Sequence, residues 1–160
     1  MARMTVKGSE ELYAMLESVQ NHSQEIASRV VYEGAGVVVR AMAAAVAALP
    51  TDDSFGTADH PKSAPSSIQK AGLVNSLGVA PHKHGGGKTD TSIGFDGYNA
   101  LRTKRWPSGQ PNAMVARSVE RGTSFMRPNP IIKRSVSASK GAAVAKMEQT
   151  AKEEIAKLTK

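Results

Sequence analysis

Residues 120–134 read Glu-Arg-Gly-Thr-Ser-Phe-Met-Arg-Pro-Asn-Pro-Ile-Ile-Lys-Arg. Gly122 has no Cβ and can adopt a positive φ, which lets the chain turn sharply there. Pro128 and Pro130 fix their own φ and hold the chain extended beyond that turn. Together these three residues predict a stiff structural turn that aims the C-terminal part of the chain in one direction.

The N-terminal third of the sequence predicts two helices, over residues 9–22 and from 23 to about 49, the second ended by Pro50. Gly34 and Gly36 lie inside the second helix, and each costs about 1 kcal/mol of helix propensity relative to Ala. We therefore expect these glycines to allow close approach by another backbone, which would make this helix the central packing element.

The second half of the sequence predicts a small sheet followed by a C-terminal helix. Apolar residues at even spacing predict strands over 73–79, 91–95 and 113–120, and a short helical turn over 131–136 precedes a helix over 139–158. We expect this last helix to bury an apolar stripe, formed by Val144, Met147, Ala151, Ile155 and Leu158. The expected fold class is α+β, in a single domain spanning residues 1–160.

Three stretches rich in Pro, Gly, Ser and Asp interrupt these elements, at about residues 51–70, 81–90 and 98–112. Loops of this length in compact domains usually carry function or are disordered.

Composition excludes several classes of site. The chain has no cysteine, so disulfides, thiolate zinc sites and a cysteine nucleophile are ruled out. Its most apolar stretch, residues 37–49, is interrupted by Arg40 and is shorter than the roughly 20 residues that cross a bilayer. We therefore expect no membrane association.

The net charge of +7 is unevenly distributed. Residues 102–160 contain 13 Lys and Arg against 4 Asp and Glu, a balance of +9, whereas residues 1–101 contain 8 against 10, a balance of −2. A basic half beside a nearly neutral half indicates an acidic or polyanionic neighbour, although ordinary solubility explains net charge equally well.

No motif in the sequence predicts catalysis or a cofactor. Residues 85–89, Gly-Gly-Gly-Lys-Thr, end like a phosphate-binding loop, but position 82 is His instead of Gly and the following residues read as a strand. His82 and His84 alternate in the same loop without a convincing third metal ligand, so we interpret them as solvated. The chain is predicted not to be an enzyme and to need no cofactor or metal.

Exposed cations and one aromatic residue remain as candidate contacts with a partner subunit or with DNA. They are Arg102, Lys104, Arg105, Trp106, Arg117, Arg121, Arg127, Lys133 and Arg134. Trp106 is suited to stack on a base or to anchor a protein contact. The alternative interpretation is that the cations are solvated and that Trp106 covers a small core.

The pattern Glu120-x-Gly122-Thr123, followed by Pro-Ile-Ile-Lys at 130–133, resembles the tail-component family of tailed bacteriophages, the gene-product-ten-like, tail-completion or head–tail joining proteins. The phrase Gly-Ser-Glu-Glu-Leu at 8–12, Pro-Thr-Asp at 50–52 and the segment 73–77 fall where that family has similar sequence. Arg121 and Ile131 depart from it, because the family usually has aromatic residues at those positions.

The resemblance implies a structural virion protein at the head–tail junction, present in the host cytoplasm during assembly. It implies a ring of about six copies that contacts neighbouring connector, tail-tube or terminator proteins and surrounds a channel for DNA. DNA contact there would be non-specific. The alternative is a small basic nucleic-acid-binding protein.

Overall fold

The longest element is a single helix, α1 (Ser9–Ala47), in a computed structural model that describes residues 9–158. The prediction of two helices meeting at residues 22 and 23 is wrong. His22 Nδ1 lies 2.8 Å from the Ser18 carbonyl, and the Ser23 hydroxyl donates to the Gln20 carbonyl at 2.8 Å. Both side chains bond back to the preceding helical turn, so neither interrupts the helix. At about 1.5 Å per residue, α1 is about 58 Å long.

The C-terminal element is also one helix, α4 (Ile131–Leu158), where the sequence predicted a short turn and a separate helix. The Ser135 hydroxyl donates to the Ile131 carbonyl, and the Ser139 hydroxyl donates to the Ser135 carbonyl, each at 2.7 Å. Serine side chains that bond four residues back remain compatible with a helix, although they disfavour it in isolation. Packing against α1 therefore supports a helix that local propensity leaves marginal.

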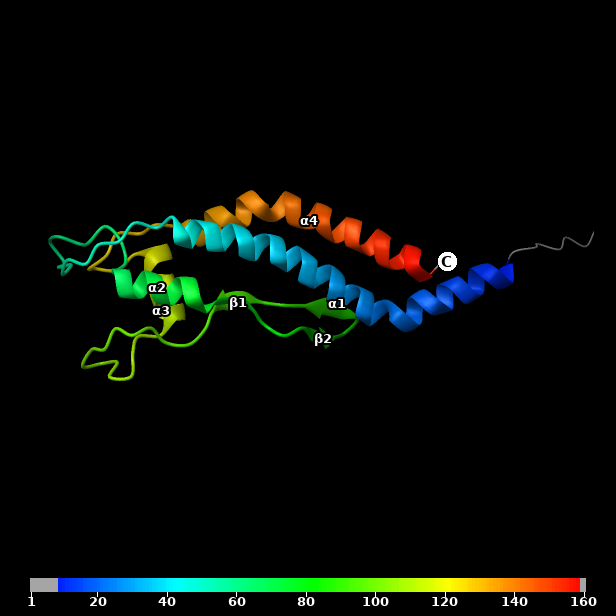
Figure 1. Cartoon of the computed structure of the whole chain (residues 1–160), viewed down its shortest axis with the longest axis horizontal. Helices are drawn as coiled ribbons and strands as arrows, with labels where there is room; N and C mark the ends of the chain where they lie inside the picture. The colour runs from blue at the N-terminus through cyan, green and yellow to red at the C-terminus, as the bar shows by residue number, and fades with distance from the viewer. Residues whose placement is uncertain (1–8, 159–160) are drawn as a thin grey trace, which may run out of the picture.

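Helices α1 and α4 run antiparallel along the long axis of the molecule (Figure 1). The buried face of α4 consists of small residues, Ser135, Ser139, Ala143 and Thr150. The predicted apolar stripe is wrong in part, since Val144 is 46% exposed and Ile155 is 36% exposed. Small side chains face α1 because the two helices approach closely: a Cβ at Gly34 would lie 2.5 Å from Cγ of Met147. The close approach predicted at Gly34 is confirmed, whereas Gly36 meets only the tip of Arg40.

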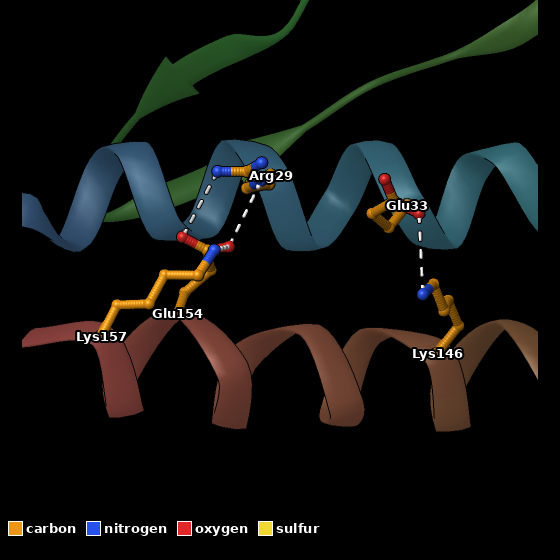
Figure 2. Close-up of polar contacts among 5 residues, drawn as sticks. All are labelled: Arg29, Glu33, Lys146, Glu154 and Lys157. Atoms are coloured by element: carbon orange, nitrogen blue, oxygen red, sulfur yellow. Dashed lines mark hydrogen bonds and ion pairs between the residues drawn. The ribbon is translucent and has the colours of Figure 1, made fainter.

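Ion pairs flank this helix contact (Figure 2). Arg29 Nε on α1 lies 3.3 Å from Oε1 of Glu154 on α4, and Lys146 Nζ lies 4.0 Å from Oε2 of Glu33. Lys157 also bonds Glu154 at 2.6 Å, and this hydrogen bond, followed by the charge of Arg29, lowers the pKa of Glu154. Ion pairs at the protein surface contribute little to stability, so these pairs supplement the packing between the two helices.

A second layer begins with α2 (Ser67–Ser76), which continues directly into strand β1 (Leu77–Val79). Ser66 and Gln69 form a capping box, in which the Ser66 hydroxyl accepts from the Gln69 backbone and the Gln69 side chain accepts from the Ser66 backbone. This cap starts α2 at Ser67, ahead of the evenly spaced apolar residues that predicted a strand from residue 73. Leu73 is therefore a fully buried helix residue, and the strand predicted from residue 73 starts only at Leu77.

Two separate two-stranded antiparallel sheets follow within the described residues. Strand β1 pairs with β4 (Ile93–Phe95), with Leu77 opposite Phe95. Between them, β2 (Lys83–Gly85) and β3 (Lys88–Asp90) form a hairpin inside the predicted loop at 81–90. Its turn is made by Gly86 and Gly87, both with positive φ, which is the geometry that a tight hairpin requires.

The third predicted strand, over 113–120, is wrong: these residues form helix α3 (Asn112–Arg121). Val115 and Val119 satisfy an even spacing, but they are also four residues apart and share one face of a helix. Together with Ala116 they are buried. The helix ends at Gly122, which adopts φ +75° as predicted.

One apolar cluster joins these elements. It contains Val46, Leu49, Leu73, Val115, Ala116, Val119 and Met126, contributed by α1, α2, α3 and the segments that follow α1 and α3. The cluster lies at one end of the long helices, where α2 and α3 pack beside α1 (Figure 1). The architecture is α+β, with helices dominating a small antiparallel sheet, as predicted.

The close approach at Gly34 yields a matched pair of variants. We expect Gly34→Val to lower the free energy of unfolding by about 1–3 kcal/mol, because the added side chain overpacks the contact with Met147. Gly36→Ala is the control, and we expect it to be neutral or to stabilise the protein by up to about 1 kcal/mol. Urea unfolding followed by circular dichroism measures both, and equal effects would contradict the assigned packing.

Candidate functional site

Residues 120–134 form a rigid joint between α3 and α4. A Cβ at Gly122 would lie 2.9 Å from both N and Cδ of Pro128, so the turn is closed as well as left-handed. Beyond it, the Asn129 backbone N–H donates to the Val119 carbonyl at 2.6 Å. Pro130 directly precedes the first residue of α4. The three predicted turn residues thus lie together between the two helices.

The carboxylate of Glu120 fixes the orientation of α4. Its Oε2 accepts from the Ile132 backbone N–H at 2.9 Å, and its Oε1 accepts from the Lys133 N–H at 3.0 Å. An acidic side chain at this position satisfies two of the free N–H groups of the helix and interacts favourably with its dipole. The Glu-x-Gly pattern therefore combines a helix cap for α4 with the turn that brings α4 within reach of it.

The loop at 51–66 is ordered by contacts with this joint. The Lys62 backbone N–H donates to the Phe125 carbonyl, and the Arg127 N–H donates to the Lys62 carbonyl, each at 2.9 Å. Asp52 ties the loop to itself, since the hydroxyl and N–H of Ser54 and the corresponding groups of Ser63 hold the pKa of Asp52 well below its usual range. Phe55 projects from this ordered loop with 99% of its surface exposed.

The structure places the candidate cations in three groups at the same end of the molecule. Arg102, Lys104 and Arg105 lie in the loop at 98–111, Arg117 and Arg121 lie one turn apart on α3, and Arg127, Lys133 and Arg134 follow the joint. All eight are exposed, and within residues 9–158 none of them forms an ion pair. The guanidinium of Arg105 lies 5.7 Å from the ring centroid of Trp106, which is half-buried.

Arg117 and Arg121 line a cleft that combines apolar and charged side chains. This cleft has a volume of about 550 Å³ and is lined by α3, β4 and one residue each from α1 and α4. Its apolar lining includes Met42, Phe95 and Ile132. Glu120 also lines the cleft, but its carboxylate accepts two hydrogen bonds from the start of α4. Arg117 and Arg121 are therefore the charged side chains of the cleft that form no ion pair among the described residues.

A second cleft, of about 670 Å³, lies between α2 and residues 96–100, and sequence reasoning missed it. Asn99 and Asn112 line it and are 6% and 3% exposed, yet Asn99 Nδ2 and Asn112 Oδ1 lack hydrogen-bond partners among the described residues. Asn112 reaches this position because Gly72 has no side chain: a Cβ there would lie 2.5 Å from Asn112 Oδ1. No local pattern marks this cleft, since its walls come from segments distant in sequence.

The first turns of α1 carry an unpartnered apolar face. Leu12, Met15 and Leu16 share one side of the helix, and all three are exposed. Every side chain from residue 10 to 17 is exposed, because this part of α1 projects beyond the end of α4 (Figure 1).

Helix α1 also bears on the expectation of no membrane contact. Residues 10–47 are long enough, and contain a window apolar enough, to cross a membrane by length and composition, with 22% of that window buried. A buried core helix meets the same criterion, so the observation is weak evidence for a membrane span.

The histidines of the β2–β3 hairpin do not lie in a cluster of metal ligands. The ring centroids of His82 and His84 are 6.3 Å apart, and His82 packs edge-on against Tyr32 at 6.2 Å. No group of three or more His, Cys, Asp or Glu residues suited to a metal occurs in the part of the chain that the structure describes. The glycines of the phosphate-loop-like stretch form the hairpin turn.

Comparisons of the chain with protein-family models, curated proteins and solved structures return no match. The features of the chain that bear on its function are the joint, the exposed apolar residues of α1 and the eight exposed cations.

The role of Glu120 can be measured through stability. We expect Glu120→Ala to lower the free energy of unfolding by about 0.5–2 kcal/mol, because two N–H groups of α4 lose their acceptor. Glu148→Ala, at an exposed position on the same helix, should change it by less than about 0.5 kcal/mol. If thermal unfolding shows equal losses for the two variants, Glu120 does not cap α4.

Proposed function

We propose that this chain is a structural subunit of the head–tail junction of a tailed bacteriophage, where copies form a ring around the path of the DNA. The observation that carries the proposal is an elongated helix pair that exposes apolar side chains at one end and, at the other, cations that form no ion pair among the described residues. Exposed apolar surface of this kind marks sites of association.

The joint at residues 120–134 supports the proposal through the resemblance to tail-completion and head–tail joining proteins. Glu120, Gly122 and Pro130, which carry the resemblance, hold α4 at a set angle to α3. A subunit of a closed ring needs a fixed internal geometry. A change in the angle between its helices would be repeated in every copy, and the ring would not close.

The loops support an assembly role as well. Phe55 and Phe125 lie in segments that are hydrogen-bonded to each other, and they are 99% and 57% exposed. An ordered loop that presents an exposed aromatic ring is typical of an interface anchor, because little conformational entropy is lost on binding. Neighbouring subunits or adjacent connector and tail proteins would cover these rings.

A small basic nucleic-acid-binding protein is the second candidate. The eight exposed cations and the contact of Arg105 with Trp106 favour it, because basic side chains beside an aromatic ring bind single-stranded nucleic acid without sequence preference. The cations lie on a loop, α3 and the joint rather than on one recognition helix, which favours backbone contact over base readout.

Assembly is tested with the purified full chain. We expect analytical ultracentrifugation to show concentration-dependent association and negative-stain electron microscopy to show closed rings. In a phage that carries this gene, its deletion should leave heads and tails unjoined, and wild-type protein should restore joining. A chain that stays monomeric at high concentration and restores no joining would refute the proposal.

The second candidate predicts binding to both single-stranded and duplex DNA with a steep dependence on salt, measured by fluorescence anisotropy. Under this hypothesis, Arg102→Ala should weaken binding to all sequences alike and reduce the salt slope by about 1 for each lost phosphate contact. Lys152→Ala on α4 is the matched control. No DNA retention at low salt would remove this candidate.

A further inference from the structure

We propose that the N-terminal end of α1 of one copy docks into the α3–β4 cleft of the next copy, so that the chain associates head to tail. The inference deepens the proposed function by naming the two surfaces that meet. These are the projecting stalk, residues 10–17, and the cleft lined by Arg117 and Arg121.

The stalk cannot remain exposed without cost. Most helical stability in proteins comes from packing an apolar face, and the stalk lacks that packing among the described residues. Leu12 and Leu16 are 56% and 55% exposed, and Met15 lies on the same side. This spacing of i, i+3 and i+4 is the anchor pattern with which an amphipathic helix enters an apolar groove.

Charge identifies what covers the stalk. Residues 10–17 contain Glu10, Glu11 and Glu17 and no Lys or Arg, a charge of −3, and none of these carboxylates forms an ion pair within the described residues. The carboxylates of two such segments repel each other, and they also disfavour contact of residues 10–17 with nucleic acid or an anionic membrane. The occupant must therefore offer apolar surface with positive charge around it.

The α3–β4 cleft offers that combination. Its lining contains Met42, Phe95 and Ile132, and Arg117 and Arg121 stand at its edge without ion-pair partners in residues 9–158. Its volume of about 550 Å³ lies within the usual range for binding clefts, about 300–1,000 Å³. Residues 102–134 as a whole contain 8 Lys and Arg against 1 Glu, a balance of +7.

The two surfaces cannot meet within one chain, because the start of α1 and helix α3, which lines the cleft, lie at opposite ends of the molecule (Figure 1). The contact is therefore between copies and is heterologous. Such a contact closes into a ring when the rotation between subunits permits and otherwise extends into a filament. In this arrangement α3 binds a protein helix, and the remaining cations of the loop at 98–111 stay available to DNA.

A charge swap tests the contact in the full chain. One variant carries Arg117→Glu and Arg121→Glu, and the other carries Glu11→Lys and Glu17→Lys. Each variant alone presents like charges at every contact, so we expect at least about tenfold weaker self-association in analytical ultracentrifugation. An equimolar mixture restores opposite charges at every contact when the two variants alternate, and we expect association to return to the wild-type level.

Two controls separate the contact from general effects. Lys140→Glu with Lys152→Glu lowers the net charge by as much as the double arginine variant does, but at exposed sites on α4, and should leave association unchanged. Leu12→Ser with Leu16→Ser should weaken association, whereas Tyr13→Ser, at an exposed position on the adjacent side of the helix, should have little effect. Circular dichroism confirms that each variant is folded.

The outcomes distinguish this inference from the proposed function. If wild-type protein assembles but the charge-reversed variants assemble equally well, or if their mixture fails to recover, the head-to-tail contact is refuted while the proposed function stands. If wild-type protein does not associate at any concentration, the contact is also refuted, and the proposed function loses its main support.

Discussion

The arrangement of the molecule depends on the contact between α1 and α4 at Gly34. Position 34 has no side chain, and α4 faces it with Ala143 and the stem of Met147, so the helix axes lie closer than larger residues would permit. Close packing of small residues increases van der Waals contact along two long helices whose sequences contain few large apolar side chains. With this seam in place, α1 keeps a second side free to support α2, α3 and the small sheet.

The joint at residues 120–134 determines how α4 reaches that seam. Gly122 turns the chain at the end of α3, Pro128 packs against it, and the Glu120 carboxylate binds the first N–H groups of α4. The cap is local in sequence, but its effect is global because it sets the direction of a 28-residue helix. The same joint anchors the loop at 51–66 through Lys62, so the exposed aromatic rings are held by the element that aims α4.

Charge is separated along the length of this rod-like molecule. The projecting end of α1 is acidic and carries exposed leucines, whereas the far end carries eight cations that form no ion pair within residues 9–158. Opposite charge and matching apolar faces at the two ends favour association in one polarity, which is the property that a ring subunit needs. Under this model the cations of the joint and the loop at 98–111 divide between protein contact and the DNA path, so positive charge alone does not identify a nucleic-acid site.

The sequence by itself determined the features that rest on short-range chemistry. These include the positive φ at Gly122, the α+β class, the strands at 77–79 and 93–95, and the need for close approach at Gly34. A glycine or proline restricts the backbone wherever it occurs, and its effect can be stated without knowing the fold. The exposed cations were likewise predictable as residue types, although not their lack of ion-pair partners.

Only the tertiary structure decided between helix and strand where one spacing suits both. Val115 and Val119 satisfy either period, and burial against α1 and α2 selected the helix. Ser23 and Ser139 stood at predicted helix boundaries, yet packing made two long helices continuous through them. The α3–β4 cleft and the projection of the stalk beyond α4 were also set by the fold, because both depend on which distant segments pack together and where that packing ends.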